Sequence, residues 1–245
     1  MRTVQILLVA LVSFALLMPS WAAVTEVGTP TLGSDTGGGT SVSVARTTTS
    51  GSKGLTVQLS YYNGSGAVAA PTLSWNGTAM TTACQSANAL GGNDKRSAVY
   101  FLADPAAGSF NLTGTFSNTA FWRLAIREWS NADNYHDCST ANGDSAAATV
   151  NVASVVSGEV ILDAVAANST IAVGAGQSTT NSYNGVLAGS SHGAASIDTS
   201  GTGTVAMNWT NGDSTWATSA FALVEASGGG GGGVVPKLMM MGVGP

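Results

Sequence analysis

The chain has 245 residues, of which 9% are charged and 44% are hydrophobic, with a formal net charge of −5 at pH 7. A sequence pI near 4.7 argues against nucleic-acid binding through phosphate contacts, because such binding needs clustered cations. The apolar content also argues against a disordered chain, because disordered sequences lack apolar residues to bury.

Residues 1–22 have the layout of a secretory signal peptide. Arg2 gives a positive start, an apolar run extends from Val4 to Met18, and Pro19 ends any helix. We expect cleavage after Ala22, with Ala23 as the alternative site. The apolar run is shorter than the ~20 residues that cross a bilayer. We therefore expect a secreted or cell-surface protein without a transmembrane span in the mature chain.

Apolar and polar residues alternate throughout residues 23–226, which is typical of half-buried β-strands. In the clearest strand, Leu55 to Tyr61, the odd-numbered side chains are apolar. Trp122, Leu124 and Ile126 form a second apolar face. The polar residues of these two strands are expected on the opposite face: Thr56, Gln58, Ser60, Arg123 and Arg127.

Turn-forming residues separate these runs, and the clearest hairpin signal is Asn76-Gly77 after Trp75. No window shows a helical stripe with caps. About twelve strands without helices predict an all-β, antiparallel β-sandwich of the jelly-roll or immunoglobulin-like kind.

Two parts of the domain, about 40–130 and 150–226, resemble each other. The strand that begins at Gly54 is similar to the one at Gly158, and the approach to Trp122 is similar to the approach to Trp216. Two sheet halves of one sandwich, two tandem domains and a chance similarity all explain this pattern. We favour one domain.

Cys84 and Cys138 are the two cysteines, and in an exported chain they predict one disulfide. We expect this bridge to lie within the first half of the domain. Free buried thiols are the alternative.

The composition changes after residue 226. Residues 227–233 form a glycine linker, and 234–245 form an apolar tail. An exposed apolar tail is costly unless something covers it. The tail is expected either to attach the protein to another copy or a surface component, or to have no role. Its apolar residues are Val234, Val235, Leu238, Met239, Met240 and Met241.

Asp133, Asp137 and Asp144 lie close in sequence to Cys138, in a predicted acidic loop. Carboxylates are ligands that calcium prefers, but the spacing of a known calcium loop is missing. His136 and His192 also lack metal-ligand spacing. We favour a solvated loop and expect no cofactor, with calcium as the one metal considered.

Trp129, Tyr62 and Tyr183 fall at predicted strand ends or in loops. Such rings could stack on sugars, so they are the candidates for a glycan-binding surface. Exposed single aromatic residues without a role are the alternative.

Gly189 to Gly193 matches the hydrolase pattern G-x-S-x-G. That pattern works on a strand-to-helix elbow, and no helix is predicted here. His192 is also badly placed as a base for Ser191, because adjacent side chains diverge in an extended chain.

A glycosidase needs two carboxylates that face each other across a cleft. Glu128, Glu159 and Asp163 lie on or beside strands, but the sequence has no compact acidic signature. We therefore expect no enzymatic activity.

Four segments resemble β-sandwich domains of bacterial secreted and phage-associated surface proteins. They are Leu55–Tyr62, Leu73–Met80, Ala98–Leu112 and Ala217–Val224. The resemblance covers about residues 40–226 and implies an extracellular or surface setting. It carries no catalytic residues.

Three functional hypotheses follow. The first is a non-catalytic structural or adhesive surface protein that self-assembles when the tail, or a strand within residues 23–31, pairs with an open sheet edge of another copy. The second is an extracellular carbohydrate-binding module. The third, which is least favoured, is a secreted hydrolase.

Overall fold

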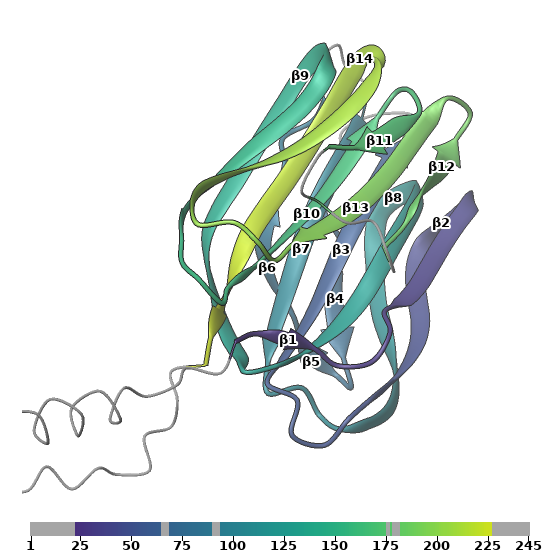
Figure 1. The fold of residues 1–245 in the computed structure, drawn as a ribbon. Helices are drawn as coiled ribbons and strands as arrows, with labels where there is room; N and C mark the ends of the chain where they lie inside the picture. Colours follow the sequence, from purple (N-terminus) through teal and green to yellow (C-terminus); the bar gives the residue numbers. More distant parts are fainter. Residues whose placement is uncertain (1–22, 65–68, 90–93, 175–176, 178–181, 227–245) are drawn as a thin grey trace, which may run out of the picture.

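The computed structural model describes residues 23–64, 69–89, 94–174, 177 and 182–226, which form β-strands and their connections (Figure 1). The predicted signal peptide (1–22), linker (227–233) and apolar tail (234–245) lie outside these residues. Within the described part of the chain, no helix is long and apolar enough to cross a bilayer.

In the described residues, fourteen strands form two antiparallel sheets, which confirms the all-β prediction. The first sheet contains β1 (Thr25–Glu26), β2 (Thr31–Thr48), β3 (Gly54–Asn63), β4 (Thr72–Trp75), β5 (Thr78–Ala79), β6 (Thr81–Gln85), β7 (Asp94–Ala103) and β8 (Gly108–Ser130). The second contains β9 (Ala132–Val155), β10 (Val160–Ala167), β11 (Ile171–Val173), β12 (Asn184–Ala188), β13 (Ser191–Asp198) and β14 (Gly203–Glu225).

Each sheet therefore comes from one continuous half of the chain, and the two halves share a plan. A long ribbon, β2–β8 in the first half and β9–β14 in the second, forms one side. The second strand of each ribbon pairs first with a short strand (β4 or β11) and then with a central strand (β3 or β10). The central strand then pairs with β7 or β13.

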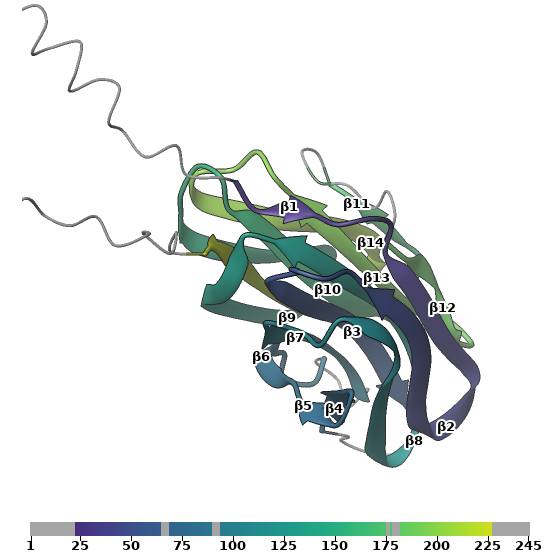
Figure 2. The same ribbon diagram turned by 90° about the horizontal axis from the view of Figure 1, so that it is seen from below.

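Both ribbons bend, so that each half curls around an interior of its own. The Tyr61 ring on β3 lies 5.4 Å from the Phe116 ring in the first part of β8. The Tyr100 hydroxyl on β7 donates to the Pro71 carbonyl, which precedes β4. In the second half, the Trp209 indole on β14 reaches back to Asp163 on β10. Figure 2 shows β4 and β5 below the central strands of the first half.

Three sets of apolar side chains follow from this curling. The interior of the first half is the largest and includes Leu59, Trp75 and Leu124. The second half is filled by two adjoining clusters around Met207 and Trp209. A further cluster lies between the sheets, where Phe101 and Trp129 of the first half meet Leu162 and Phe221 of the second.

The central strands are consequently buried on both faces. All eight residues of β10 are buried, as are nine of the ten residues of β3. Thr56, Gln58, Ser60 and Arg127 lie on the face opposite the apolar one, as predicted, but the second sheet covers that face. A simple inside-outside reading of the alternation was therefore wrong for these strands.

Polar side chains join the two sheets across this interface. The Gln58 amide donates to the carbonyls of Asp163 and Ser196, both at 2.7 Å. The Ser60 hydroxyl lies 2.7 Å from the Val165 carbonyl and 2.8 Å from the Tyr183 hydroxyl. These bonds satisfy groups that would be costly to bury unpaired.

The predicted disulfide between Cys84 and Cys138 is confirmed. Its expected location within the first half was wrong, because Cys84 lies on β6 of the first sheet and Cys138 on β9 of the second. The bridge therefore links the two sheets covalently. Cys84 is buried, whereas Cys138 is exposed.

The N-terminal strand is used within its own chain. In β1, Thr25 pairs with Ser130 and Glu26 with Trp129, both on β8. Within this chain, β8 therefore pairs with Thr25 and Glu26, and pairing of residues 23–31 with another copy stays a prediction.

Candidate functional site

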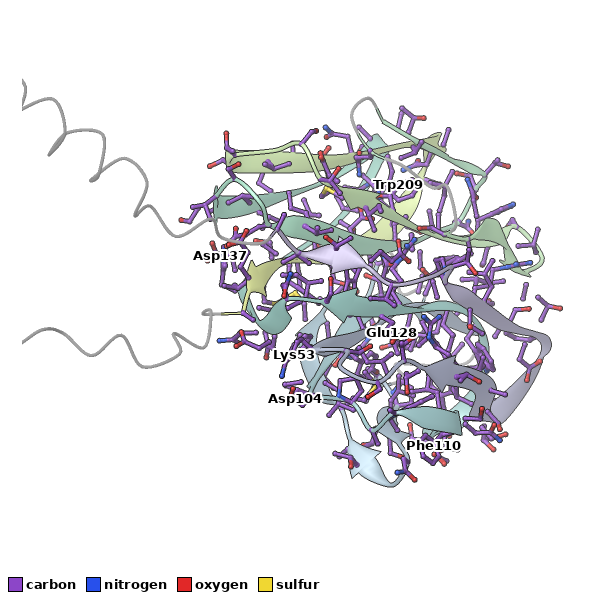
Figure 3. All side chains as sticks on the ribbon, turned by 60° about the horizontal axis from the view of Figure 1, so that its bottom comes forward. Lys53, Asp104, Phe110, Glu128, Asp137 and Trp209 are labelled. Atoms are coloured by element: carbon purple, nitrogen blue, oxygen red, sulfur yellow. A yellow bond between two sulfur atoms is a disulfide. The ribbon has the colours of Figure 1, made fainter. Side chains whose placement is uncertain are left out.

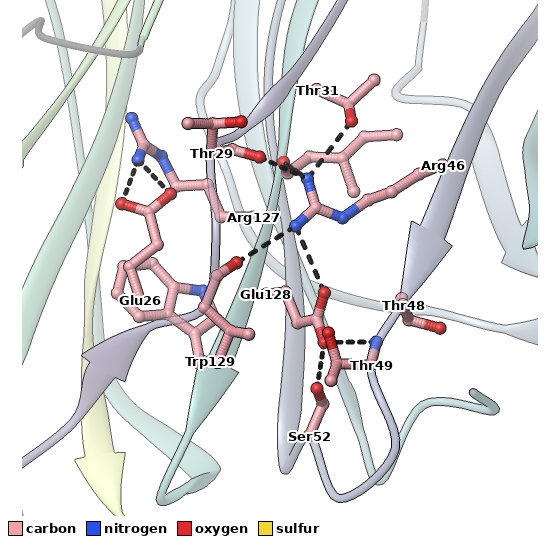
Figure 4. A network of polar contacts seen from close by, with 12 residues as sticks. Glu26, Thr29, Thr31, Arg46, Thr48, Thr49, Ser52, Arg127, Glu128 and Trp129 are labelled. Atoms are coloured by element: carbon pink, nitrogen blue, oxygen red, sulfur yellow. Dashed lines mark hydrogen bonds and ion pairs between the residues drawn. The ribbon is translucent and has the colours of Figure 1, made fainter. Parts of the chain in front are cut away.

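A network of charged and polar side chains surrounds Arg46 and Glu128 in the first half (Figure 4). Arg46 on β2 donates to the Ile126 carbonyl at 3.0 Å and to the Thr29 carbonyl at 3.1 Å. It also forms an ion pair with Glu128 at 3.3 Å. Because Ile126 and Glu128 lie in the second part of β8, these contacts fasten the bent ribbon to itself.

Glu128 accepts three kinds of donor. Besides Arg46, the Thr49 backbone N–H donates at 2.7 Å, and the Ser52 hydroxyl donates to the same oxygen. Burial alone would raise the pKa of Glu128, but the bonds from Ser52, Thr49 and Arg46 outweigh it and lower that pKa. Glu128 is therefore held as a charged structural anchor.

Arg127 points the other way from β8, into the interface between the sheets. Its guanidinium binds both carboxylate oxygens of Glu26, at 2.7 and 2.8 Å, and donates to Gln58 at 2.8 Å. Both bonds to Glu26 come from one guanidinium nitrogen, Nη1, and are charge-assisted. Burial lowers the pKa of Arg127, and the neighbouring Glu26 opposes that shift. This pair fixes β1 on the body.

Asp163 lies in the interior of the second half. It accepts bonds from the Ser196 N–H at 2.9 Å, the Ser196 hydroxyl at 2.7 Å and the Trp209 indole N–H at 2.5 Å. All three donors are neutral. Burial prevails over these hydrogen bonds and raises the pKa of Asp163 to about 7.

Glu159 belongs to a third group, between β9 and β10. Its carboxylate oxygens lie 2.9 and 3.0 Å from His136 Nε2, and one of them accepts the Val156 N–H. His136 Nδ1 also contacts Asp137 at 2.8 Å. Burial lowers the pKa of His136, but Glu159 and Asp137 outweigh it and raise the pKa.

The three carboxylates considered for a glycosidase are thus engaged in separate places. Glu128 is in the first half, whereas Asp163 lies in the interior of the second and Glu159 precedes β10. Figure 3 shows Glu128 and the indole of Trp209, the partner of Asp163, apart in the molecule. Each carboxylate has a structural partner, so the geometry supplies no acid–base pair from these residues.

The aromatic residues proposed for glycan stacking are placed differently from expectation. Trp129 is 1% exposed and donates to Thr56, and Tyr183 is 4% exposed. Their predicted exposure was wrong. The second sheet covers Trp129, and Tyr183 lies in the interface between the sheets, where its hydroxyl contacts Ser60. Tyr62 is half-buried, with Phe121 stacked against it and the Lys95 ammonium 4.8 Å from its ring centre.

The predicted acidic loop is part of a strand. Asp133, Asp137 and Asp144 all lie on β9, and Asp137 contacts His136. Across the described residues, no group of three or more His, Cys, Asp or Glu side chains could hold a metal ion.

The residues of the G-x-S-x-G match form a turn between β12 and β13, followed by β13 itself. Ser191 is buried, and His192 Nδ1 lies 2.9 Å from the Ser190 carbonyl rather than beside a nucleophile. The absence of a helix after this match agrees with the sequence prediction, within the part of the chain that the structure describes.

The outer face of the β2–β8 ribbon carries an open depression of about 340 Å³. Its exposed side chains are small and uncharged: Ala45, Thr47, Ser109 and Asn111. Thr47 and Ser109 bond to each other at 2.7 Å across the strands. The depression forms part of a neutral, hydroxyl-rich surface.

The sequence prediction missed the roles of Arg46, Glu26 and Asp163. A signal was present for Asp163, because the chain has few charges and yet places this residue within a strongly apolar strand. A charge in such a strand is rarely buried without a partner. The ion-pair partners of Arg46 and Glu26 lie 82 and 101 residues away and the Trp209 partner of Asp163 lies 46 away, so they could not be found from local pattern.

No protein-family model, curated protein or solved structure matches the chain.

Proposed function

We propose that this protein is an exported, non-catalytic structural or adhesive surface protein. The observation that carries the proposal is the Cys84–Cys138 bridge, which joins a strand of one sheet to a strand of the other. Disulfides persist in oxidising compartments outside the cytosol. Together with the signal-peptide pattern of residues 1–22, this bond supports export.

The internal chemistry supports a rigid body. Acidic groups fasten elements, as buried Glu128 fastens β2 to β8 and half-buried Glu26 fastens β1 to β8. Inter-sheet bonds from Gln58 and Ser60 add further links. A body built in this way suits a protein that must keep its shape while attached to a surface or a neighbour.

The resemblance to jelly-roll or immunoglobulin-like sandwiches of bacterial and phage surface proteins belongs to this proposal. The two packed antiparallel sheets support it. The contiguous halves are a distinguishing feature, since immunoglobulin sandwiches exchange strands between their two sheets along the chain.

In the proposed role, the apolar residues of 234–245 attach the body to a surface component through the linker 227–233. Deletion of residues 228–245 should release the protein from the surface fraction into the medium, with the circular dichroism spectrum of the body unchanged. Cell fractionation with an antibody against the body measures this release.

A full-length chain that stays in the cytosol with its leader uncleaved would contradict export. A truncated chain that stays on the surface would contradict the attachment role of the tail. A matched control replaces Lys237 with Ala, which keeps the length and apolar character of the tail.

A further inference from the structure

Two strand edges of this protein lack the features that usually prevent edge-to-edge association. Between Ser41 and Thr48, β2 pairs with β8 without a change of register. Between Ala147 and Val152, β9 pairs with β14 in the same uninterrupted way. On their other sides, neither strand pairs with any strand of the described chain.

The chemistry of these two edges is unusual for exposed strands. Natural edge strands carry Lys, Pro, bulges or inward-pointing charges that discourage pairing. The 41–48 run has one charged residue, Arg46, whose side chain is 5% exposed and bonded inside the body. The 147–152 run, Ala-Ala-Thr-Val-Asn-Val, has no charge, Pro or Gly. Short uncharged segments of this kind favour strand pairing.

The other edges of the described sheets are blunted. In β2, Asp35 accepts the Gly37 and Gly38 N–H groups, and the register shifts between Asp35 and Ser41. Strands β6 and β12 have five residues each and an irregular register. The beginning of β9 is occupied by the disulfide and by a bond from Asn142 to the Asn88 carbonyl. The contrast selects 41–48 and 147–152, which we name the β2 edge and the β9 edge.

These two edges are equivalent in the plan of the two halves, because β2 and β9 are the outer strands of the two long ribbons. They lie on opposite sides of the molecule (Figure 1). A body with two open edges on opposite sides can pair at both, so association continues beyond a dimer. Because both edges are outwardly neutral, pairing brings no like charges together, although the whole chain carries a net charge of −5.

We propose that a second copy of this chain is the partner of each edge, so that the protein forms a linear assembly through the β2 and β9 edges. This inference deepens the proposed structural role and rests on it. New main-chain hydrogen bonds would supply the affinity, as in other strand additions. When two edges pair in register, residues directly opposite each other point to the same face of the extended sheet. Inward-facing side chains of one copy therefore lie beside inward-facing side chains of the next.

The test uses the processed full chain and sedimentation velocity over a range of concentrations. Ser43 and Asn151 are exposed residues on the two edges, and each is replaced by Lys. The wild type should reach masses above a dimer as concentration rises. The variant S43K/N151K should remain a monomer. A control variant, N111K, places the same charge on an exposed residue of β8, one strand inside the β2 edge, and should assemble like the wild type.

The single variants identify the contacts. If unlike edges pair, S43K and N151K should each remain monomeric, because every contact needs one intact edge of each kind, while an equimolar mixture of the two should form mixed dimers. If like edges pair, each single variant should stop at dimers through its intact edge, and the mixture should contain no mixed dimer. A wild type that stays monomeric, or an S43K/N151K variant that assembles like the wild type, overturns the proposal.

Deletion of residues 228–245 separates this inference from the proposed attachment role. The edges should still assemble after the deletion, even where surface retention is lost. If the deletion abolishes assembly while S43K/N151K does not, the tail and not the edges joins the copies, and the edge proposal fails.

Discussion

The two halves of the molecule bury carboxylates in opposite ways. In the first half, Glu128 meets the Arg46 cation and donors from Thr49 and Ser52, and its pKa is lowered. In the second half, Asp163 meets neutral donors from Ser196 and Trp209, and its pKa is raised to about 7. At Glu128 the hydrogen bonds from Ser52 and Thr49, with a smaller contribution from Arg46, outweigh burial, whereas at Asp163 the bonds from Ser196 and Trp209 do not.

The comparison extends to the central strands, whose registers match. Val57 on β3 pairs with Ile126 four residues after Trp122, and Asp163 on β10 pairs with Ala220 four residues after Trp216. Val57 and Asp163 therefore hold equivalent positions. The shared fold accepts either an apolar or an acidic residue there, provided that the surrounding side chains suit it.

The largest expected effect comes from exchanging these environments. In Val57→Asp, a carboxylate enters an apolar interior where Tyr100 stands in the place of Ser196 and directs its hydroxyl to Pro71. A buried carboxylate without partners should cost more than about 4 kcal/mol and prevent stable folding. Urea unfolding followed by tryptophan fluorescence measures the loss.

The control Val57→Ala removes two methyl groups and should cost on the order of 2 kcal/mol. If Val57→Asp and Val57→Ala are equally stable at pH 7.5, the interior of the first half tolerates a charge, and the contrast with the second half fails.

The second prediction concerns the bond that holds the halves together. Replacing both Cys84 and Cys138 with Ser removes a link that closes a loop with a sequence separation of 54. In the chain-entropy model this costs about 4 kcal/mol. The double variant should therefore unfold at lower urea concentration than the oxidised wild type.

The wild type kept reduced should match the double variant. A double variant as stable as the oxidised protein would show that the non-covalent interface alone holds the two sheets together.

The third prediction uses the raised pKa of Asp163. A folded pKa above the unfolded value means that stability is fully present below about pH 4 and is lost as pH rises through about 7. The shift from 3.8 to about 7 corresponds to at most about 4 kcal/mol. In Asp163→Asn this part of the pH dependence should disappear, although the amide N–H₂ will oppose the Trp209 donor.

Urea unfolding of the wild type and Asp163→Asn at several pH values between 4 and 8 gives the difference in their free energies of unfolding directly. Equal slopes for the wild type and Asp163→Asn would mean that Asp163 stays ionised in the folded protein.

Sequence reasoning recovered the features that depend on local pattern. The strand at Leu55–Tyr61 and the hairpin at Asn76-Gly77 are present, because alternation and turn chemistry act over a few residues. The disulfide was found because a chain with two cysteines allows one intramolecular pairing.

Features set by packing between distant segments were beyond that reasoning. Arg127 was placed on the polar face correctly, yet its burial depends on the second sheet, which alternation along β8 does not reveal. Trp129 and Tyr183 were assigned to the surface because they lie near strand ends, but the curled sheets bring other strands over them. The candidate site depends most on these long-range contacts and was therefore predicted least well.

The smallest expected effect concerns His136, which has no histidine counterpart on β2. Its raised pKa means that its contribution to stability is present below pH 6.5 and is lost as pH rises through the folded value. Because the group is partly solvated, the effect should stay below about 1 kcal/mol. The melting temperature of the wild type should therefore fall slightly above pH 6.5, and that of His136→Gln should not.

Proton NMR of the His136 ring can follow the titration itself, and the His136→Gln variant assigns the resonance. A His136 pKa at or below 6.5 would show that Glu159 and Asp137 fail to offset its burial.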